Sequence, residues 1–370
     1  MTIVLRALAA GAGLVIVVAT LAATLRTVVL PRGVPSKLAR VVFLATRRLF
    51  ALRLGRAASY ERRDAVMALY GPISLLSLLA VWLVLILLGY TLIFLGLGWP
   101  AYSHRPVLAL EESGSSLFTL GFLPPPGVLA ALVSFSEAAI GMAQLALLIS
   151  YLPSLYARFS QREFVVAKLE VRAGSPPRGW TMIIRANRLG DLTSLTEVWR
   201  SWEDWFIDVE ESHTSNAVLV FFRSPQPDKS WVTAAGAVLD GAALRVSALA
   251  AERDVEAQLC IRAGFISLRR IASYFQVPFD PDPAPTDPIS ISRMELDSAL
   301  DEMAAAGVAL KPDRDQIWRD FAGWRVNYDT VLIGLAQLTM AAYAPWSSDR
   351  SLARRPQAGL RRLVGRRGGN

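Results

Sequence analysis

The sequence predicts an all-α membrane protein with three transmembrane helices, a re-entrant pore helix and filter loop, and then a mainly α-helical cytoplasmic domain. Hydrophobic residues make up 53% of the 370 residues and charged residues only 19%, which is too apolar for a soluble protein of this length. The apolar excess lies in the first 157 residues. That part contains three apolar runs, each long enough to supply the roughly 20 residues that cross a bilayer core.

The three apolar runs cover residues 3–30, 65–102 and 128–157. The second run is longer than one span requires, so we place its helix at 74–97. The first run has small residues around 19–23, which makes a cleaved signal peptide the alternative interpretation. We favour an uncleaved helix, because cleavage would leave the arginine-rich connection that follows as a translocated N-terminus.

The basic residues predict the orientation. The connection at 31–64 carries nine Lys or Arg residues against Glu61 and Asp64, whereas the connection before the third run carries only Arg105. The positive-inside rule therefore predicts a multi-pass cell-membrane protein with the 31–64 connection and the C-terminal domain in the cytoplasm. Residues 36–56 alternate apolar residues with arginine and form either an amphipathic helix on the inner membrane surface or a helix packed on protein. Anionic lipid headgroups, not nucleic acid, are the expected partner of these charges.

The connection between the second and third runs contains an informative stretch at 107–127. Residues 108–118 suit a helix that is too short to span the membrane, and the extended segment 119–122 follows it. Leu123 and three prolines then exclude a continued helix. A short helix, an extended segment and a helix breaker between two spans indicate a re-entrant loop, because bare backbone at membrane depth is tolerated only inside protein or beside water.

The extended segment consists of Thr119, Leu120, Gly121 and Phe122. In this position between two spans, it resembles the TVGYG filter of the potassium-channel pore family of the bacterial two-transmembrane-pore type, and the resemblance covers residues 65–163. The resemblance implies a homotetramer in which backbone carbonyls replace the hydration shell of permeating monovalent cations, with K⁺ as the leading ion. Gly121 would meet the need for unusual backbone angles, and Leu120 and Phe122 would pack on the short helix.

Two residues depart from the family pattern. Leu123 stands at the fifth filter position, where the family has glycine, and Pro124 stands where an acidic residue usually follows. A second hypothesis is therefore a non-conducting, membrane-anchored sensor or scaffold that keeps a channel-like pore module. Neither hypothesis is an enzyme: the sequence has no P-loop, nucleophile elbow or metal-ligand spacing, so we expect no cofactor and no metal beyond permeating cations.

Polar residues near the loop are candidates for supporting the filter. Glu137, in the third run, is expected either to brace the filter by accepting serine hydrogen bonds or to reach water at the outer interface. The candidate serine donors are Ser113, Ser115 and Ser116. Glu111 and Glu112 are expected either to attract cations to the outer mouth or simply to be solvated.

The third run also carries candidates for gating and permeation. Gly141 is either a hinge or a close-packing site, and Pro153 is a candidate kink near the cytoplasmic exit. Gln144, Leu148 and Tyr151 share one helical face and are the candidate pore-lining residues.

The remaining chain predicts a bundle of helices, which we expect at 194–212, 231–249, 254–275, 293–306 and 314–342. We also expect a strand at 164–172 and breaks at 173–179, 224–229 and 278–288. Trp199, Trp202 and Trp205 recur on one helical face and favour packing over a ligand site, and His213 is interpreted as structural. The predicted organisation is a first helix at 1–30, a basic connection at 31–64, a pore module at 65–157, a cytoplasmic domain at 158–346 and a disordered basic tail at 347–370.

Overall fold

The computed structural model describes residues 2–28, 37–53, 60–99, 102 and 105–350. These residues form helices and loops, without any strand. They divide into two compact units: an N-terminal unit of residues up to 159 together with 215–222, and a C-terminal unit of 160–214 and the residues from 223 onward. Most of the basic tail expected at 347–370 lies outside the described residues.

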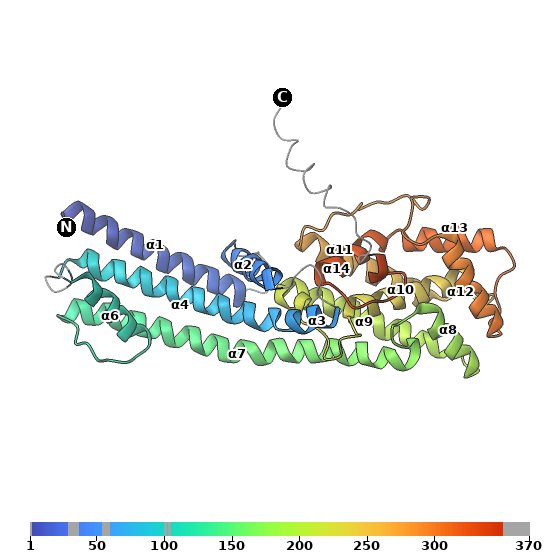
Figure 1. The fold of residues 1–370 in the computed structure, drawn as a ribbon, viewed down its shortest axis with the longest axis horizontal. Coiled ribbons are helices and arrows are strands. Elements are labelled where there is room, and N and C mark those ends of the chain that lie inside the picture. The colour runs from blue at the N-terminus through green and yellow to red at the C-terminus, as the bar shows by residue number, and fades with distance from the viewer. Residues whose placement is uncertain (1, 29–36, 54–59, 100–101, 103–104, 351–370) are drawn as a thin grey trace, which may run out of the picture. The chain divides into compact units, whose positions relative to one another are not determined.

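The N-terminal unit contains three helices that are long and apolar enough to cross a membrane, which confirms the three expected spans by length and composition. Its helical elements are α1 (Ile3–Val28), α2 (Lys37–Arg53), α3 (Tyr60–Ala68), α4 (Tyr70–Leu97), α6 (Pro106–Leu117), the part of α7 (Val128–Ala173) up to residue 159, and the 3₁₀ helix η1 (Ala217–Phe221). The three long helices are α1, α4 and α7, and α1 lies alongside α4 (Figure 1). Helix α4 begins four residues before the expected start, because Pro72 falls in its first turn, where the missing N–H has no helical partner.

Small residues let α1 and α4 approach closely. A Cβ atom on Gly96 would lie 2.6 Å from the Cβ of Ala10, and one on Gly89 would lie 2.8 Å from Cγ2 of Val17. Lipid tails are as apolar as the helices, so close packing of small residues is a main source of helix association in a membrane. Close packing therefore joins α1 to α4 at two positions of α4, Gly89 and Gly96, that are one heptad apart.

Helix α2 packs one face on α4 and exposes the other. Its buried Ala39 and Val42 form a cluster with Leu78 and Trp82 of α4. The exposed face carries large apolar residues next to basic ones: Lys37, Arg40, Val41, Leu44, Arg48, Leu49 and Leu52. Packing on protein is thus present, and contact of the exposed face with a membrane surface stays a prediction.

Residues 215–222 join the N-terminal unit although they lie between two helices of the C-terminal unit in sequence. Val218 and Leu219 of η1 are buried in one cluster with Leu75 of α4 and Leu155 of α7. The Tyr70 ring packs edge-on against Phe221, with ring centroids 5.3 Å apart. The expected boundary between the pore module and the C-terminal domain, near residue 158, is therefore not a single break in the chain. Residues 215–222 also belong to the N-terminal unit.

The C-terminal unit is built around α10, in which every residue except Arg245 and Val246 is buried. Its helices are the end of α7, α8 (Gly179–Arg188), α9 (Ser194–Ser215), α10 (Trp231–Ser247), α11 (Val255–Tyr274), α12 (Arg293–Ala305), α13 (Arg314–Arg325), α14 (Asp329–Thr339) and η2 (Ser348–Arg350). Helices α8, α11, α13 and α14 pack around α10 (Figure 1). The tryptophans of α9, Trp199, Trp202 and Trp205, are buried, as expected for packing residues.

Two sequence expectations for the C-terminal unit are wrong, and one helix is missing from them. The strand at 164–172 is the continuation of α7, where residues 162, 166, 169 and 173 are buried at a helical period that outweighs the β-branched composition. The helix at 314–342 is divided into α13 and α14, because the Asn327 side chain donates to the carbonyls of Gly323 and Trp324 and ends the first helix. Helix α8 follows the expected break at 173–179 directly and was not expected at all.

Candidate functional site: the loop between α6 and α7

The short helix α6 covers Pro106–Leu117, close to the expected 108–118. It ends in a Schellman motif: the Leu120 N–H donates to the Ser115 carbonyl at 2.8 Å, and the Thr119 N–H donates to the Ser116 carbonyl at 3.0 Å. Thr119 occupies the left-handed position of this motif with φ +55°. Glycine or asparagine usually takes that position, and a β-branched residue there stores strain of about 1–3 kcal/mol. The strained residue is the first residue of the predicted filter.

The residues of the predicted filter segment are exposed. The carbonyl oxygens of residues 119–122 accept no hydrogen bond from any described residue. Gly121 has φ +66°, the left-handed conformation that glycine adopts most readily, and a Cβ there would meet nothing within 4 Å. The Leu120 and Phe122 side chains do not pack on α6 as expected but are 64% and 60% exposed in the single chain. Four consecutive carbonyls are thus available to a ligand.

Two reciprocal hydrogen bonds join α6 to α7, and we call them the carboxylate–serine pairs. The Ser113 hydroxyl of α6 lies 2.5 Å from Oε1 of Glu137, and the Ser134 hydroxyl of α7 donates to Oε1 of Glu112 at 2.8 Å. Glu137 is fully buried and Glu112 is 3% exposed. Each helix therefore contributes one carboxyl group and one hydroxyl to a buried contact, which fixes α6 in rotation and height against α7.

The pairs decide between the alternatives for the acidic residues. Of the three candidate donors to Glu137, Ser113 makes the bond; the Ser115 hydroxyl instead accepts the Phe122 N–H at 3.2 Å and ties the filter segment to α6. The Ser116 carbonyl accepts the Thr119 N–H at the end of α6. Glu111 is exposed, but the expectation that Glu112 sits at an outer mouth or in solvent is wrong, because Glu112 turns toward Ser134.

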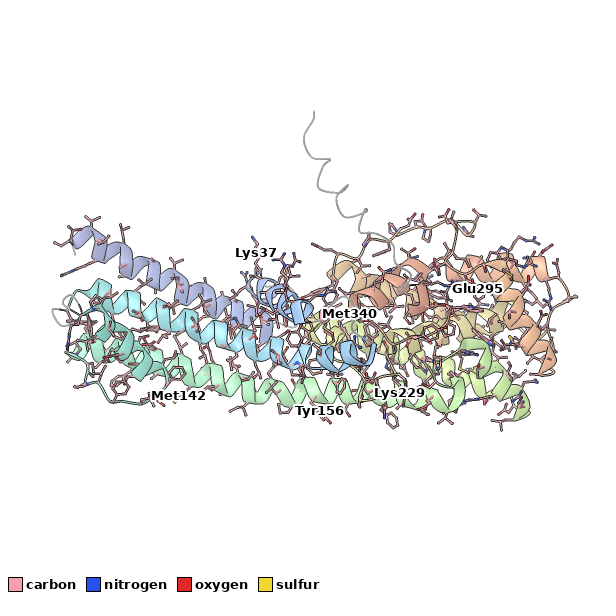
Figure 2. The ribbon with its side chains drawn as sticks, in the orientation of Figure 1. Lys37, Met142, Tyr156, Lys229, Glu295 and Met340 are labelled. Atoms are coloured by element: carbon pink, nitrogen blue, oxygen red, sulfur yellow. The ribbon has the colours of Figure 1, made fainter. Side chains whose placement is uncertain are left out.

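The candidate residues on α7 lie on the face directed into the chain. Gln144 is 3% exposed, and neither of its side-chain polar atoms has a partner in the described part of the chain. The same is true of Oε2 of Glu137, two helical turns earlier. Leu148 is half-buried, and the Tyr151 hydroxyl donates to the Asn216 side chain at 2.9 Å. The opposite face is exposed and apolar: Leu132, Phe135, Met142, Leu145, Ile149 and Leu152, with Met142 labelled in Figure 2.

Gly141 is a close-packing position. A Cβ atom there would collide with the carbonyl oxygen of Leu117, the last residue of α6. The end of α6 therefore rests directly on the α7 backbone one turn after Glu137. Pro153 lies inside α7, which continues past it to Ala173.

Comparison with known proteins returns no match. No protein-family model, no curated protein and no solved structure matches the chain. The resemblance to the potassium-channel pore family therefore rests on the residues of 65–163 and on their order between two spans.

Sequence reasoning missed the pair formed by Glu112. A signal for it was present: the Glu-Ser dipeptide at 112–113 faces the Ser-x-x-Glu spacing of 134–137, which puts the second serine and carboxyl on one helical face. Two complementary motifs on neighbouring helices predict reciprocal pairing only if the helices meet in the right rotation. The packing of Gly141 against Leu117 sets this rotation, and the sequence does not show it.

Proposed function

We propose that the chain is one subunit of a tetrameric cation channel that conducts K⁺ past the backbone carbonyls of residues 119–122. The observation that carries the proposal is a run of four exposed residues, between two candidate spans, whose carbonyls accept no hydrogen bond from the described residues. Such carbonyls can replace the water around a cation, and unpaired backbone in a membrane belongs beside water or inside protein. One loop supplies a quarter of a ring, so four copies would surround one axis.

The carboxylate–serine pairs have a positioning role in this proposal. They anchor α6 to α7, and the bond from the Phe122 N–H to the Ser115 hydroxyl anchors the filter segment to α6. A filter must hold its oxygens at fixed radii, which requires rigid support from packed helices. Gln144 is enclosed by its own chain, so the proposal does not require it to line the ion path.

The membrane placement follows from charge. We propose that the N-terminal unit lies in the cell membrane with its α2 side toward the cytoplasm, and that the C-terminal unit is cytoplasmic. The support is the basic composition of α2 and of the segment after the third span, against the single basic residue, Arg105, of the connection between α4 and α7. Anionic lipid headgroups are then the partners of the exposed basic residues of α2.

The test is ion flux through the purified full-length protein in planar lipid bilayers with K⁺ or Na⁺. We expect a K⁺ current in the unmodified protein and a loss of about tenfold or more in Gly121→Ala, because a Cβ in the left-handed region costs about 1–2 kcal/mol in each subunit. Gly127→Ala is the matched control, since Gly127 lies in the same loop, has no positive φ and meets nothing within 4 Å. Equal currents in the two variants would contradict permeation at residue 121.

A second candidate function is a non-conducting, membrane-anchored sensor or scaffold. Leu123 favours it, because this residue stands where the family filter has glycine and its φ is not positive. No current from the unmodified protein, and none after Leu123→Gly, would support this candidate. A protein that is monomeric in the bilayer by native mass spectrometry would exclude the channel proposal, because one loop cannot close a ring.

A further inference from the structure

The C-terminal unit contains a cleft that is distinct from the loop between α6 and α7. It has a volume of about 580 Å³ and is lined by the end of α7, by α8 and by the start of α9. Its apolar lining consists of Val171, Met182, Ala186, Leu189 and Leu195. Its basic lining consists of Lys168, Arg172, Arg185 and Arg188. The volume lies within the range of about 300–1,000 Å³ that small-molecule sites occupy.

The charges of this cleft are largely unneutralised. No Asp or Glu is among the described residues that line it. Arg185 is held in place by donating to the carbonyls of Glu170 and Val171 at 3.1 and 2.7 Å. Lys168, Arg172 and Arg188 make neither a hydrogen bond nor an ion pair with the rest of the described chain. Three of the four basic lining side chains are therefore free to pair with an anion.

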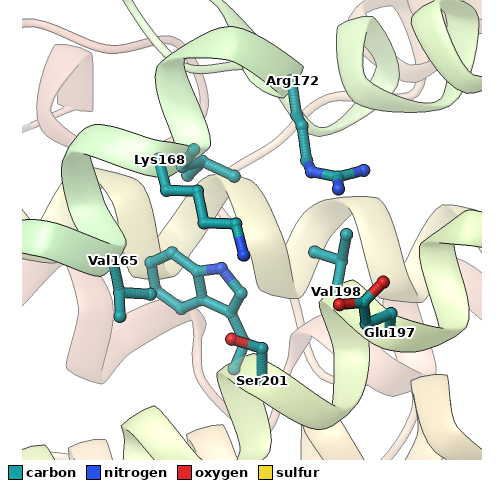
Figure 3. Close-up of a pocket in the computed structure, with 8 residues that line it drawn as sticks. Val165, Lys168, Arg172, Glu197, Val198 and Ser201 are labelled. Carbon is teal, nitrogen blue, oxygen red and sulfur yellow. The ribbon is translucent and has the colours of Figure 1, made fainter.

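A smaller cavity of about 70 Å³ adjoins the cleft and shares Lys168 and Arg172 with it. In Figure 3 both side chains extend from α7 toward α9, where the Glu197 carboxylate and the Ser201 hydroxyl lie. Glu197 is the one acidic residue that lines either space, and it forms no ion pair within the described ranges. A single carboxylate against four basic side chains leaves a positive excess.

We propose that this cleft binds a free amphiphilic anion, that is, a carboxylate or phosphate monoester that carries an alkyl chain. The three arginines offer forked donors that match carboxylate and phosphate oxygens, and the five apolar residues accept the chain. A nucleic acid fits less well, because none of the described residues that line the cleft has an aromatic ring on which a base could stack. The proposal is independent of whether the chain conducts ions.

The test is isothermal titration calorimetry on the full-length protein in phosphatidylcholine nanodiscs, with empty nanodiscs as the partitioning background. We expect saturable binding of octyl phosphate and octanoate at one site per chain, binding of inorganic phosphate at least about tenfold weaker, and no saturable binding of octanol or octylammonium. This pattern requires both the anionic head and the chain. Octanol that binds as tightly as octyl phosphate would overturn the proposal.

Variants of the lining residues locate the site. Arg172→Gln and Arg188→Gln should each weaken octyl phosphate binding about fivefold, and Val171→Glu should abolish it. Val171 is 78% exposed, so its replacement leaves the core intact. Arg262→Gln is the matched control, because Arg262 is exposed on α11 and is not part of the cleft. Unchanged binding in all three cleft variants would overturn the proposal. Loss of octyl phosphate binding in nanodiscs that contain phosphatidylglycerol would also overturn it, because that result would assign the site to bilayer headgroups.

Discussion

Two buried carboxyl groups in each unit have opposite kinds of partner. In the C-terminal unit, Asp240 and Asp329 are buried beside Arg325, whose Nε donates to Asp329 at 2.8 Å and whose Nη1 donates to Asp240. In the N-terminal unit, Glu112 and Glu137 are equally buried, but their partners are serine hydroxyls, and neither forms an ion pair with a described residue. A cation compensates the first two acids, and neutral donors contact the second two.

The two kinds of contact differ in how many elements they join. Arg325 also donates to the Trp346 carbonyl, and the Tyr328 hydroxyl donates to Asp240 at 2.9 Å, so one guanidinium joins α10, α13, α14 and the segment before η2. Such a network is strong only while every member is present. The carboxylate–serine pairs join only α6 and α7, and each is a single hydrogen bond, which contributes about 1–3 kcal/mol. The loss of a residue should therefore have very different effects in the two units.

The largest effect is expected from Arg325→Gln. Removing the cation leaves Asp240 and Asp329 buried without their charge partner, which should lower the free energy of unfolding of the C-terminal unit by about 3–5 kcal/mol. Denaturant titration of the full-length protein, followed by tryptophan fluorescence, measures this change. Arg262→Gln, on the exposed side of α11, should stay within about 0.5 kcal/mol. A loss below about 1 kcal/mol for Arg325→Gln would show that the network is not a unit.

An intermediate effect is expected on the pH dependence of stability, and its source is His213. This residue is buried between Ser212 and Arg162. Burial, and then the positive charge of Arg162, lower the pKa of His213 well below its ordinary value. Below about pH 6.5 the unfolded chain takes up a proton at this residue and the folded chain does not, so stability should fall with falling pH by about 1.4 kcal/mol per unit. His213→Gln keeps an acceptor for Arg162 and should remove this part of the pH dependence, as measured by unfolding at pH 7.5 and 5.5. Identical slopes in both proteins would exclude His213 as the cause.

The smallest effect is expected from Glu137→Gln in the N-terminal unit. The amide oxygen still accepts the Ser113 hydrogen bond and no ion pair is lost, so unfolding in a detergent titration should change by less than about 1 kcal/mol. Glu111→Gln, which changes an exposed residue one position before Glu112, is the control for altered charge. A loss as large as that of Arg325→Gln would break the comparison, because it would mean that Glu137 is buried as a charged, paired group.

Much of the N-terminal unit was predictable because its signals are local. Apolar length placed α1, α4 and α7, and the expected end of the short helix at residue 118 lies one residue after the end of α6. The positive φ of Gly121 was predictable as well, since glycine is the residue that adopts it without strain. The positive φ of Thr119 was not, because only the hydrogen bonds of the helix end impose it.

The sequence by itself determined three membrane-length helices, the short helix before a proline-rich breaker, and most helices of the C-terminal unit, because these depend on apolar period and on backbone chemistry within a few residues. Only the tertiary structure decided the pairing of Glu112 with Ser134, the return of residues 215–222 to the N-terminal unit, and the cleft at Arg172 and Arg188. Each of these brings together side chains that are remote in sequence. Their contact depends on the rotation and separation of whole helices, which no local pattern encodes.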